Sequence, residues 1–246
     1  MIANLSKFQA IFLNKSKEHI DTNIEIDGNI IDSSNLVTLL GLEIDDKLNF
    51  DSHISNLCTK AGGQLNCLYR YKKYLSSSAK KLALNSYIYS NFSYCPIAWH
   101  LSSAKSKNKI EKIQQRALKL LHNNSEQTSI FKPGLSTMQV KRLRILAVEV
   151  YKTINNINPS YMKEIFLTSD NRSSERFKYN ITSQRFNQVK YGKKSIRVLA
   201  PVLWNSLPTQ VKSLPTLDSF KSFINTWGNY GCPLYNKFTS YIEATN

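Results

Sequence analysis

The hydrophobic pattern of this 246-residue chain changes its period once, near residue 51, and this change limits the folds that the chain can adopt. Before residue 51, apolar residues alternate or form short runs, as strands do, and 24–26 is one example. After residue 51, apolar residues recur every three or four positions, as in amphipathic helices. We therefore predict an α+β fold, with a small N-terminal antiparallel sheet followed by a mainly α-helical body.

The N-terminal region carries three turn signals between its apolar runs. Asp27-Gly28 lies between apolar flanks and predicts a tight hairpin turn. Gly41 lies inside an apolar run, where it indicates a bulge or a close backbone approach. Asp45-Asp46-Lys47 predicts the next turn. The predicted strands are 8–13, 24–26, 30–31 and 37–44.

Apolar periodicity and capping residues divide the rest of the chain into helices. Serine, threonine and aspartate side chains can accept hydrogen bonds from the free N–H groups that begin a helix, and Pro96 ends the second one. The predicted helix starts are Asp51 or Ser52, Ser76-Ser77-Ser78, Ser106, Ser136-Thr137, Pro159 and Thr216. The second helix is expected to face the core with Leu82, Ala83, Tyr87 and Ile88. The chain after Gly228 is expected to fray.

The charge is distributed unevenly along the chain. The whole chain has a formal net charge of +16 at pH 7. Residues 1–57 contain 4 lysines and arginines against 9 aspartates and glutamates, a net charge of −5. Residues 58–246 contain 29 against 8, a net charge of +21. Such an excess attracts polyanions by Coulomb attraction and counterion release, so we expect a nucleic-acid partner.

Several classes of protein are excluded by what the sequence lacks. No apolar run approaches the roughly 18 residues that a membrane span needs, and the N-terminus lacks the pattern of a secretory signal peptide. We therefore expect an intracellular protein, in the nucleus or the cytoplasm, that is neither secreted nor held in a membrane. The cysteines form no Cys-x-x-Cys pair, which predicts reduced, mostly buried thiols rather than disulfides or a zinc site. These cysteines are Cys58, Cys67, Cys95 and Cys232.

One pair of adjacent carboxylates, Asp45-Asp46, is the candidate for a catalytic metal site. Paired aspartates on a hairpin can hold two Mg²⁺ ions for phosphoryl or nucleotidyl transfer. The alternative is turn chemistry, because aspartate side chains hydrogen-bond the backbone of a turn. We favour the turn, since 44 residues are too few to supply the other carboxylates and the substrate scaffold before Asp45. Nucleophile-elbow, dinucleotide-binding and P-loop motifs are also absent from the sequence.

Two basic stretches are the candidate nucleic-acid contacts. In 69–74, tyrosines alternate with basic residues, so rings can stack on bases or sugars while the cations neutralise phosphates. The alternative is a helix end with half-buried tyrosines and solvated lysines. The second stretch lies in a polar region, 168–194, which we predict to be an exposed loop. Its basic residues, with one just beyond it, are Arg172, Arg176, Lys178, Arg185, Lys190, Lys193, Lys194 and Arg197.

Five segments share a pattern with a known family. The most informative is 39–70, which fits LG-x-x-[ILV]-[DN]-x-x-L-x-[FW]-x-x-HI at Leu40, Gly41, Ile44, Asp45, Leu48, Phe50, His53 and Ile54. The others are an Asn-x-x-Lys element at 4–7, a Tyr-Cys-x-x-x-Trp segment at 94–99, the helix-like stretch 109–121, and the ending 195–224. In this order they resemble the C-terminal part of the reverse transcriptases of non-LTR (LINE-type) retrotransposons.

The resemblance implies the end of the palm, the primer grip, the thumb and the C-terminal extension, without the catalytic palm aspartates. Asp45-Asp46 then corresponds to the primer-grip turn. The full-length family uses Mg²⁺, whereas this chain is expected to bind no cofactor and to keep only non-specific binding of template–primer RNA, DNA or RNA–DNA hybrid. The residues expected to contact nucleic acid are Lys7, Gly41, Lys60, Arg70, Lys72, Lys73, Arg176, Arg185, Lys193 and Lys194.

The resemblance also suggests three parts: 1–50 for the palm end and primer grip, 51–167 for a helical, thumb-like domain, and 168–246 for a basic loop and C-terminal extension. Two other functions stay open at this point. One is RNA-directed DNA polymerase activity with the missing carboxylates supplied upstream or in trans. The other is a remnant or interaction protein with no selected activity. The sequence does not indicate an oligomeric state.

Overall fold

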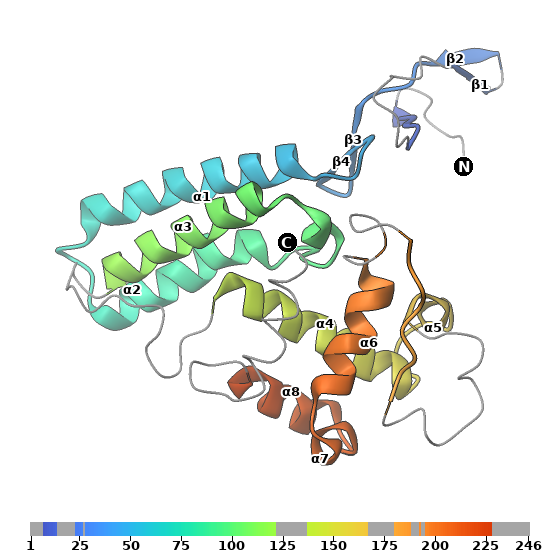
Figure 1. Ribbon diagram of the computed structural model, residues 1–246. Helices are drawn as coiled ribbons and strands as arrows, with labels where there is room; N and C mark the ends of the chain where they lie inside the picture. The colour runs from blue at the N-terminus through green and yellow to red at the C-terminus, as the bar shows by residue number, and fades with distance from the viewer. Residues whose placement is uncertain are drawn as a thin grey trace.

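Two short antiparallel hairpins precede a helical body, which confirms the predicted α+β class (Figure 1). The computed structural model describes residues 7–13, 23–26, 28–121, 137–166, 180–187, 192 and 195–227. Within those ranges, every helix is too short or too polar to span a bilayer.

The first hairpin pairs β1 (Ile24–Ile26) with β2 (Asn29–Ile31), as the turn signal at 27–28 predicts. Gly28 has a φ of +74°, a left-handed conformation that glycine adopts without a steric penalty. The predicted strand at 8–13 is wrong, because this segment makes only an isolated bridge between Ala10 and Ser33. This segment still contacts the sheet region through Gln9, whose Oε1 accepts a hydrogen bond from the Thr38 N–H.

The prediction of one strand over 37–44 is wrong, because this region forms a second hairpin. This stretch forms β3 (Leu36–Leu39) and β4 (Leu42–Asp45), joined by a two-residue turn. Leu40 and Gly41 in that turn have φ values of 49° and 82°, and tight hairpins favour such a pair of positive angles. Gly41 is therefore a turn residue rather than a bulge.

A carboxylate connects the second hairpin to the first long helix, α1 (Asp51–Tyr71). Asp45 accepts hydrogen bonds from the backbone N–H groups of Lys47 and Asn49 at Oδ1 and of Phe50 at Oδ2. Phe50 occupies the N-cap position with a φ of 56° and a buried ring. The predicted caps Asp51 and Ser52 are thus wrong, because Asp45 and the buried Phe50 fix this helix end instead.

Three helical segments pack side by side as a bundle (Figure 1): α1, the irregular helix α2–η2–η3, and α3 (Ala104–Leu121). The irregular helix consists of α2 (Ser77–Ala83), the π-helical turn η2 (Leu84–Ile88) and the 3-10 turn η3 (Tyr89–Phe92). Its core residues are Leu84, Ile88 and Phe92. The predicted core residues Leu82 and Tyr87 are 70% and 60% exposed, because the buried positions recur every four residues through the π turn. These positions are Lys80, Leu84, Ile88 and Phe92.

The 3-10 turn η4 (Ala98–Leu101) lies between η3 and α3. A second group of helices follows α3: α4 (Met138–Ile154), α5 (Tyr161–Phe166), α6 (Ile196–Ser206), α7 (Thr209–Lys212) and α8 (Leu217–Thr226). Thr137 caps α4 and Thr216 caps α8, each accepting a hydrogen bond from a first-turn N–H. The rings of Tyr151 and Phe220 stack with centroids 4.3 Å apart, and Trp204 lies 6.0 Å from Phe220. The short helix α7 was not expected from the sequence.

The buried apolar residues form two clusters that meet near the start of α4. The bundle cluster runs from Leu42 to Met138, and the C-terminal cluster includes α4, α5 and α6 to α8. The packing therefore groups α4 and α5 with the C-terminal helices. The three-part division at residues 50 and 167 stays a prediction.

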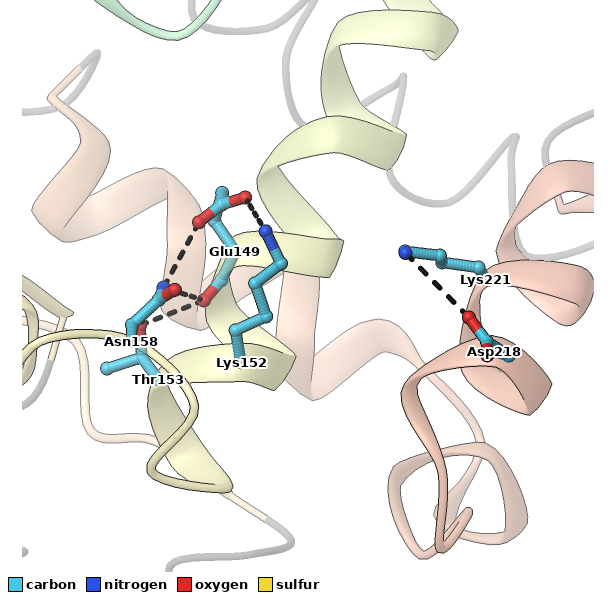
Figure 2. A network of polar contacts seen from close by, with 6 residues as sticks. All are labelled: Glu149, Lys152, Thr153, Asn158, Asp218 and Lys221. Carbon is cyan, nitrogen blue, oxygen red and sulfur yellow. Dashed lines mark hydrogen bonds and ion pairs between the residues drawn. The ribbon is translucent and has the colours of Figure 1, made fainter.

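A polar network fixes the connection between α4 and α5 (Figure 2). The Asn158 Nδ2 donates to the backbone oxygen of Glu149, to the Glu149 carboxylate and to the Thr153 hydroxyl. Glu149 also pairs with Lys152 at 2.7 Å. Figure 2 shows a second ion pair between Asp218 and Lys221 at 3.8 Å on α8. Acidic and basic side chains thus lie close together in this half of the protein.

The described cysteines are reduced, as predicted, but two of them are not buried. Cys67 and Cys95 are exposed, whereas Cys58 is half-buried, and burial raises the pKa of its thiol to about 11. Cys232 and the tail expected to fray after Gly228 lie outside the described residues.

Candidate nucleic-acid interface

The α1–α2 turn brings basic side chains together at one end of the bundle. At the start of the turn, the Lys72 N–H donates a hydrogen bond to the Tyr69 backbone oxygen. At its end, the Ser76 hydroxyl accepts a hydrogen bond from the Ala79 N–H and caps α2. Arg116 on α3 reaches the same end, since the Tyr69 hydroxyl donates to its backbone oxygen at 2.8 Å. We define the basic tip as Arg70, Lys72, Lys73, Lys80 and Arg116.

A cavity of about 500 Å³ opens at the basic tip. Lys72, Lys73 and Lys80 line it with their basic side chains, and Ser76 and Ser77 add hydroxyl groups. Lys80 is only 5% exposed, so its stem is held in the bundle rather than extended into solvent. Ammonium and hydroxyl donors around one small space are complementary to a phosphate group.

Of the tyrosines in the stretch 69–74, two are exposed and free to stack on a nucleic acid, and one packs against the bundle. Tyr71 and Tyr74 are 60% and 85% exposed, so their rings can stack on a base or a sugar. Tyr69 instead packs against the bundle, where its hydroxyl binds Arg116 and its ring lies 5.7 Å from the Lys72 Nζ. Burial raises the pKa of the Tyr69 hydroxyl, and the Arg116 charge opposes that rise.

From residue 58 onward the bundle carries almost no negative charge of its own, and its other acidic residue, Asp51, begins α1 at the end away from the basic tip. Residues 58–121 contain 12 lysines and arginines and one acidic residue, Glu111, a net charge of +11. The Glu111 carboxylate accepts hydrogen bonds from the backbone N–H groups of Met138 and Gln139, at 3.3 and 3.0 Å. Burial raises the pKa of Glu111, while these bonds and nearby basic residues lower it. The one acid is therefore used to begin α4, and this segment holds no second carboxylate to balance its basic side chains.

The ten residues predicted to contact nucleic acid do not form one site. Arg70, Lys72 and Lys73 lie together at the basic tip. Gly41 lies near the other end of α1, about 30 Å away at 1.5 Å per residue. Lys60 is exposed between them on α1, and Lys7 is exposed near the N-terminal hairpins.

The loop residues are separate from the basic tip. Arg185 is exposed in the segment 180–187, beside Arg197 at the start of α6, and both line one cavity. Arg176, Lys193 and Lys194 lie outside the described residues. Segment 180–187 is not a free loop, because Ile181 is buried and exchanges two hydrogen bonds with Asn205 at 2.9 and 2.8 Å.

Lys80 and Arg116 are members of the basic tip that sequence reasoning did not select. Lys80 follows the serine run that caps α2, and this proximity to the 69–74 stretch was the available signal. Arg116 has no such signal, since it lies 45 positions after Tyr71 and only the packing of α3 on α1 brings them together.

In the described structure, Asp45 of the Asp45-Asp46 pair takes part in the turn chemistry that the sequence favoured. The Asp45 carboxylate is already bound by three backbone N–H groups, as turn chemistry requires. In the part of the chain that the structure describes, no three histidine, cysteine, aspartate or glutamate side chains gather as a metal centre would need. These residues therefore do not fit the Mg²⁺ pair used by the full-length family that the sequence resembles.

Comparisons with known proteins do not assign the chain to a family. No protein-family model matches it, and no curated protein or solved structure does either.

Proposed function

We propose that the three-helix bundle binds the phosphate backbone of nucleic acid, without strong sequence preference, and that the basic tip is the centre of this interface. We further propose that the chain is the C-terminal part of a non-LTR retrotransposon reverse transcriptase that lacks the catalytic palm aspartates. The role left to such a chain is to hold template–primer RNA, DNA or RNA–DNA hybrid rather than to extend it.

The observation that carries the proposal is the net charge of +11 on residues 58–121 together with the position of Glu111. Each phosphate that a lysine or arginine neutralises releases condensed counterions, and this release favours binding. Contacts to phosphates fix position but carry no base sequence, so dispersed basic side chains on helices predict weak sequence preference. We expect a dissociation constant on the order of 10⁻⁴ to 10⁻⁶ M at physiological salt.

Fluorescence anisotropy with labelled duplex DNA, RNA–DNA hybrid and single strands, each titrated at several salt concentrations, tests the proposal. The logarithm of the affinity should fall linearly with the logarithm of the salt concentration. Replacing Arg70, Lys72 and Lys73 together with glutamine should reduce the steepness of that line by up to about 3 units, one for each phosphate that the variant no longer neutralises.

A second triple variant removes the same charge elsewhere. Lys152, Lys163 and Lys221 lie on α4, α5 and α8, so their replacement with glutamine should leave the slope nearly unchanged. An equal loss of slope in both triple variants would mean that net charge alone drives binding. An absence of binding at low salt would contradict the interface altogether.

A further inference from the structure

A second cavity, of about 740 Å³, lies between α5, the segment 184–187 and the start of α6. In Figure 1 the segment 180–187 runs beside α6 and past α5. Ile165, Ile196 and Val198 provide apolar surface within the cavity. Its volume is in the range of about 300–1,000 Å³ that is typical of small-ligand pockets.

The side chains at the mouth of this cavity have three kinds of chemistry. Arg185 and Arg197 are exposed and bring two guanidinium groups, which match phosphate oxygens in geometry and charge. The Phe186 ring is 40% exposed although it belongs to the cavity wall. Gln184 and Asn187 add amide groups that can both donate and accept hydrogen bonds. All described residues that line the cavity are basic, uncharged polar or apolar.

We propose that this cavity binds one unpaired nucleotide, with its base stacked on Phe186, its phosphate held by Arg185 and Arg197, and its base edge in reach of Gln184 and Asn187. We call it the nucleotide pocket. The source of the ligand is either a single-stranded nucleic acid or a free nucleotide. The pocket belongs to the C-terminal cluster and not to the bundle, so this inference does not depend on the function proposed for the basic tip.

Gly192 lies directly against the aromatic wall. A β-carbon placed on Gly192 would lie 2.7 Å from the Phe186 Cβ, which is closer than nonbonded carbon atoms approach. A glycine at this position therefore lets the chain pass directly against the base of the Phe186 side chain. Gly192→Ala should displace the ring without changing the charge of the pocket.

Isothermal titration calorimetry of the full chain with adenosine monophosphate, and separately with inorganic phosphate, tests the proposal. Phe186→Leu should weaken the binding of the nucleotide about ten-fold and leave that of phosphate unchanged, because the variant has no aromatic ring on which the base can stack. Phe186→Tyr keeps an aromatic ring at this position and should bind the nucleotide as the wild type does. Arg185→Gln and Arg197→Gln should each weaken the binding of both ligands, and Gly192→Ala should behave like Phe186→Leu.

A four-nucleotide single strand identifies the source of the ligand. This comparison is made in the Arg70, Lys72 and Lys73 triple variant, because the basic tip is itself proposed to bind single strands. Tighter binding of the strand than of the mononucleotide by that variant assigns the pocket to single-stranded nucleic acid, and equal or weaker binding assigns it to the free nucleotide. Lys163→Gln, an exposed change on α5 outside the pocket lining, should change neither affinity. Nucleotide binding that is equal in the wild type, Phe186→Leu and Arg197→Gln would overturn the proposal, as would no binding at millimolar concentration. Loss of binding in the Arg70, Lys72 and Lys73 triple variant would instead place the nucleotide at the basic tip.

Discussion

The guanidinium carbon of Arg142 lies 5.0 Å from the centroid of the Trp99 ring, and both side chains are buried. Trp99 belongs to the bundle cluster and Arg142 to α4, so this contact joins the two parts of the body. Burial lowers the pKa of Arg142 to about 10, and the nearby Glu111 carboxylate opposes this decrease. The Arg142 Nε and Nη1 have no hydrogen-bond partner among the described residues.

The first prediction is that Arg142→Met leaves the free energy of unfolding unchanged or raises it by about 1–4 kcal/mol, because an apolar chain of similar length avoids the desolvation of a poorly hydrogen-bonded charge. Urea denaturation measures the difference. Arg144→Met is the matched control on the same helix: the Arg144 Nε donates to the Trp227 backbone oxygen at 2.8 Å. That variant should lose about 1–3 kcal/mol. A large loss in Arg142→Met would instead show that the contact of the guanidinium with the Trp99 ring outweighs the cost of burying its charge.

The second prediction concerns Trp204, which is fully buried in the C-terminal cluster beside Phe220. Trp204→Ala should lower the free energy of unfolding by about 3–5 kcal/mol, as expected when a large buried aromatic side chain is truncated. Trp204→Phe should lose less, since the ring contact is kept and the buried indole N–H has no hydrogen-bond partner in the described residues. An unchanged melting temperature in Trp204→Ala would contradict the observed packing.

The third prediction is that Asp45→Ala lowers the free energy of unfolding by about 1–3 kcal/mol, because backbone N–H groups of the turn lose their acceptor. Asp46→Ala is the matched control at the neighbouring position and should have a smaller effect. Chemical denaturation of both variants makes the comparison. Equal losses would mean that the turn does not depend on the Asp45 carboxylate.

The pattern at 40–54 shows how much of the fold the sequence could predict. The aspartate turn and the helix that follows were predicted from local chemistry. The turn at Leu40-Gly41 was missed because leucine at a φ of 49° is a rare turn residue and gives no signal of its own.

The candidate surfaces were less predictable than the fold, since they combine distant segments. The stretch 69–74 could be selected from its composition, but the contributions of Lys80 and Arg116 depend on how α2 and α3 pack. The nucleotide pocket joins Ile165 of α5 with residues between 184 and 198. Periodicity describes one helix or strand at a time, so it cannot indicate which helix ends will meet.

The fourth prediction is that the chain does not extend a primed RNA template in the presence of Mg²⁺ or Mn²⁺. Two-metal nucleotidyl transfer needs several convergent carboxylates, and the Asp45 carboxylate is already bound by backbone N–H groups. A primer-extension assay with labelled primer measures the activity. Extension that is abolished by Asp45→Asn, in a variant that remains folded, would contradict this prediction and favour a polymerase.

The fifth prediction is a loss of stability at mildly acidic pH that depends on His53. This side chain is 5% exposed, its Nδ1 accepts the Glu43 N–H at 3.5 Å, and its Nε2 has no partner in the described residues. Burial lowers the pKa of His53 in the folded protein, and the Glu43 charge opposes this effect. The unfolded chain therefore binds a proton first as the pH falls below about 6.5. The free energy of unfolding should be highest above that pH and should decrease as the pH falls through the folded pKa, where protonation of Nδ1 also removes its capacity to accept from Glu43.

Urea denaturation at pH 7.5, 6.5 and 5.5, intervals of about one unit around the ordinary histidine pKa, should show a smaller decrease in His53→Gln than in the wild type. Parallel decreases in the two proteins would assign the acid sensitivity to other groups.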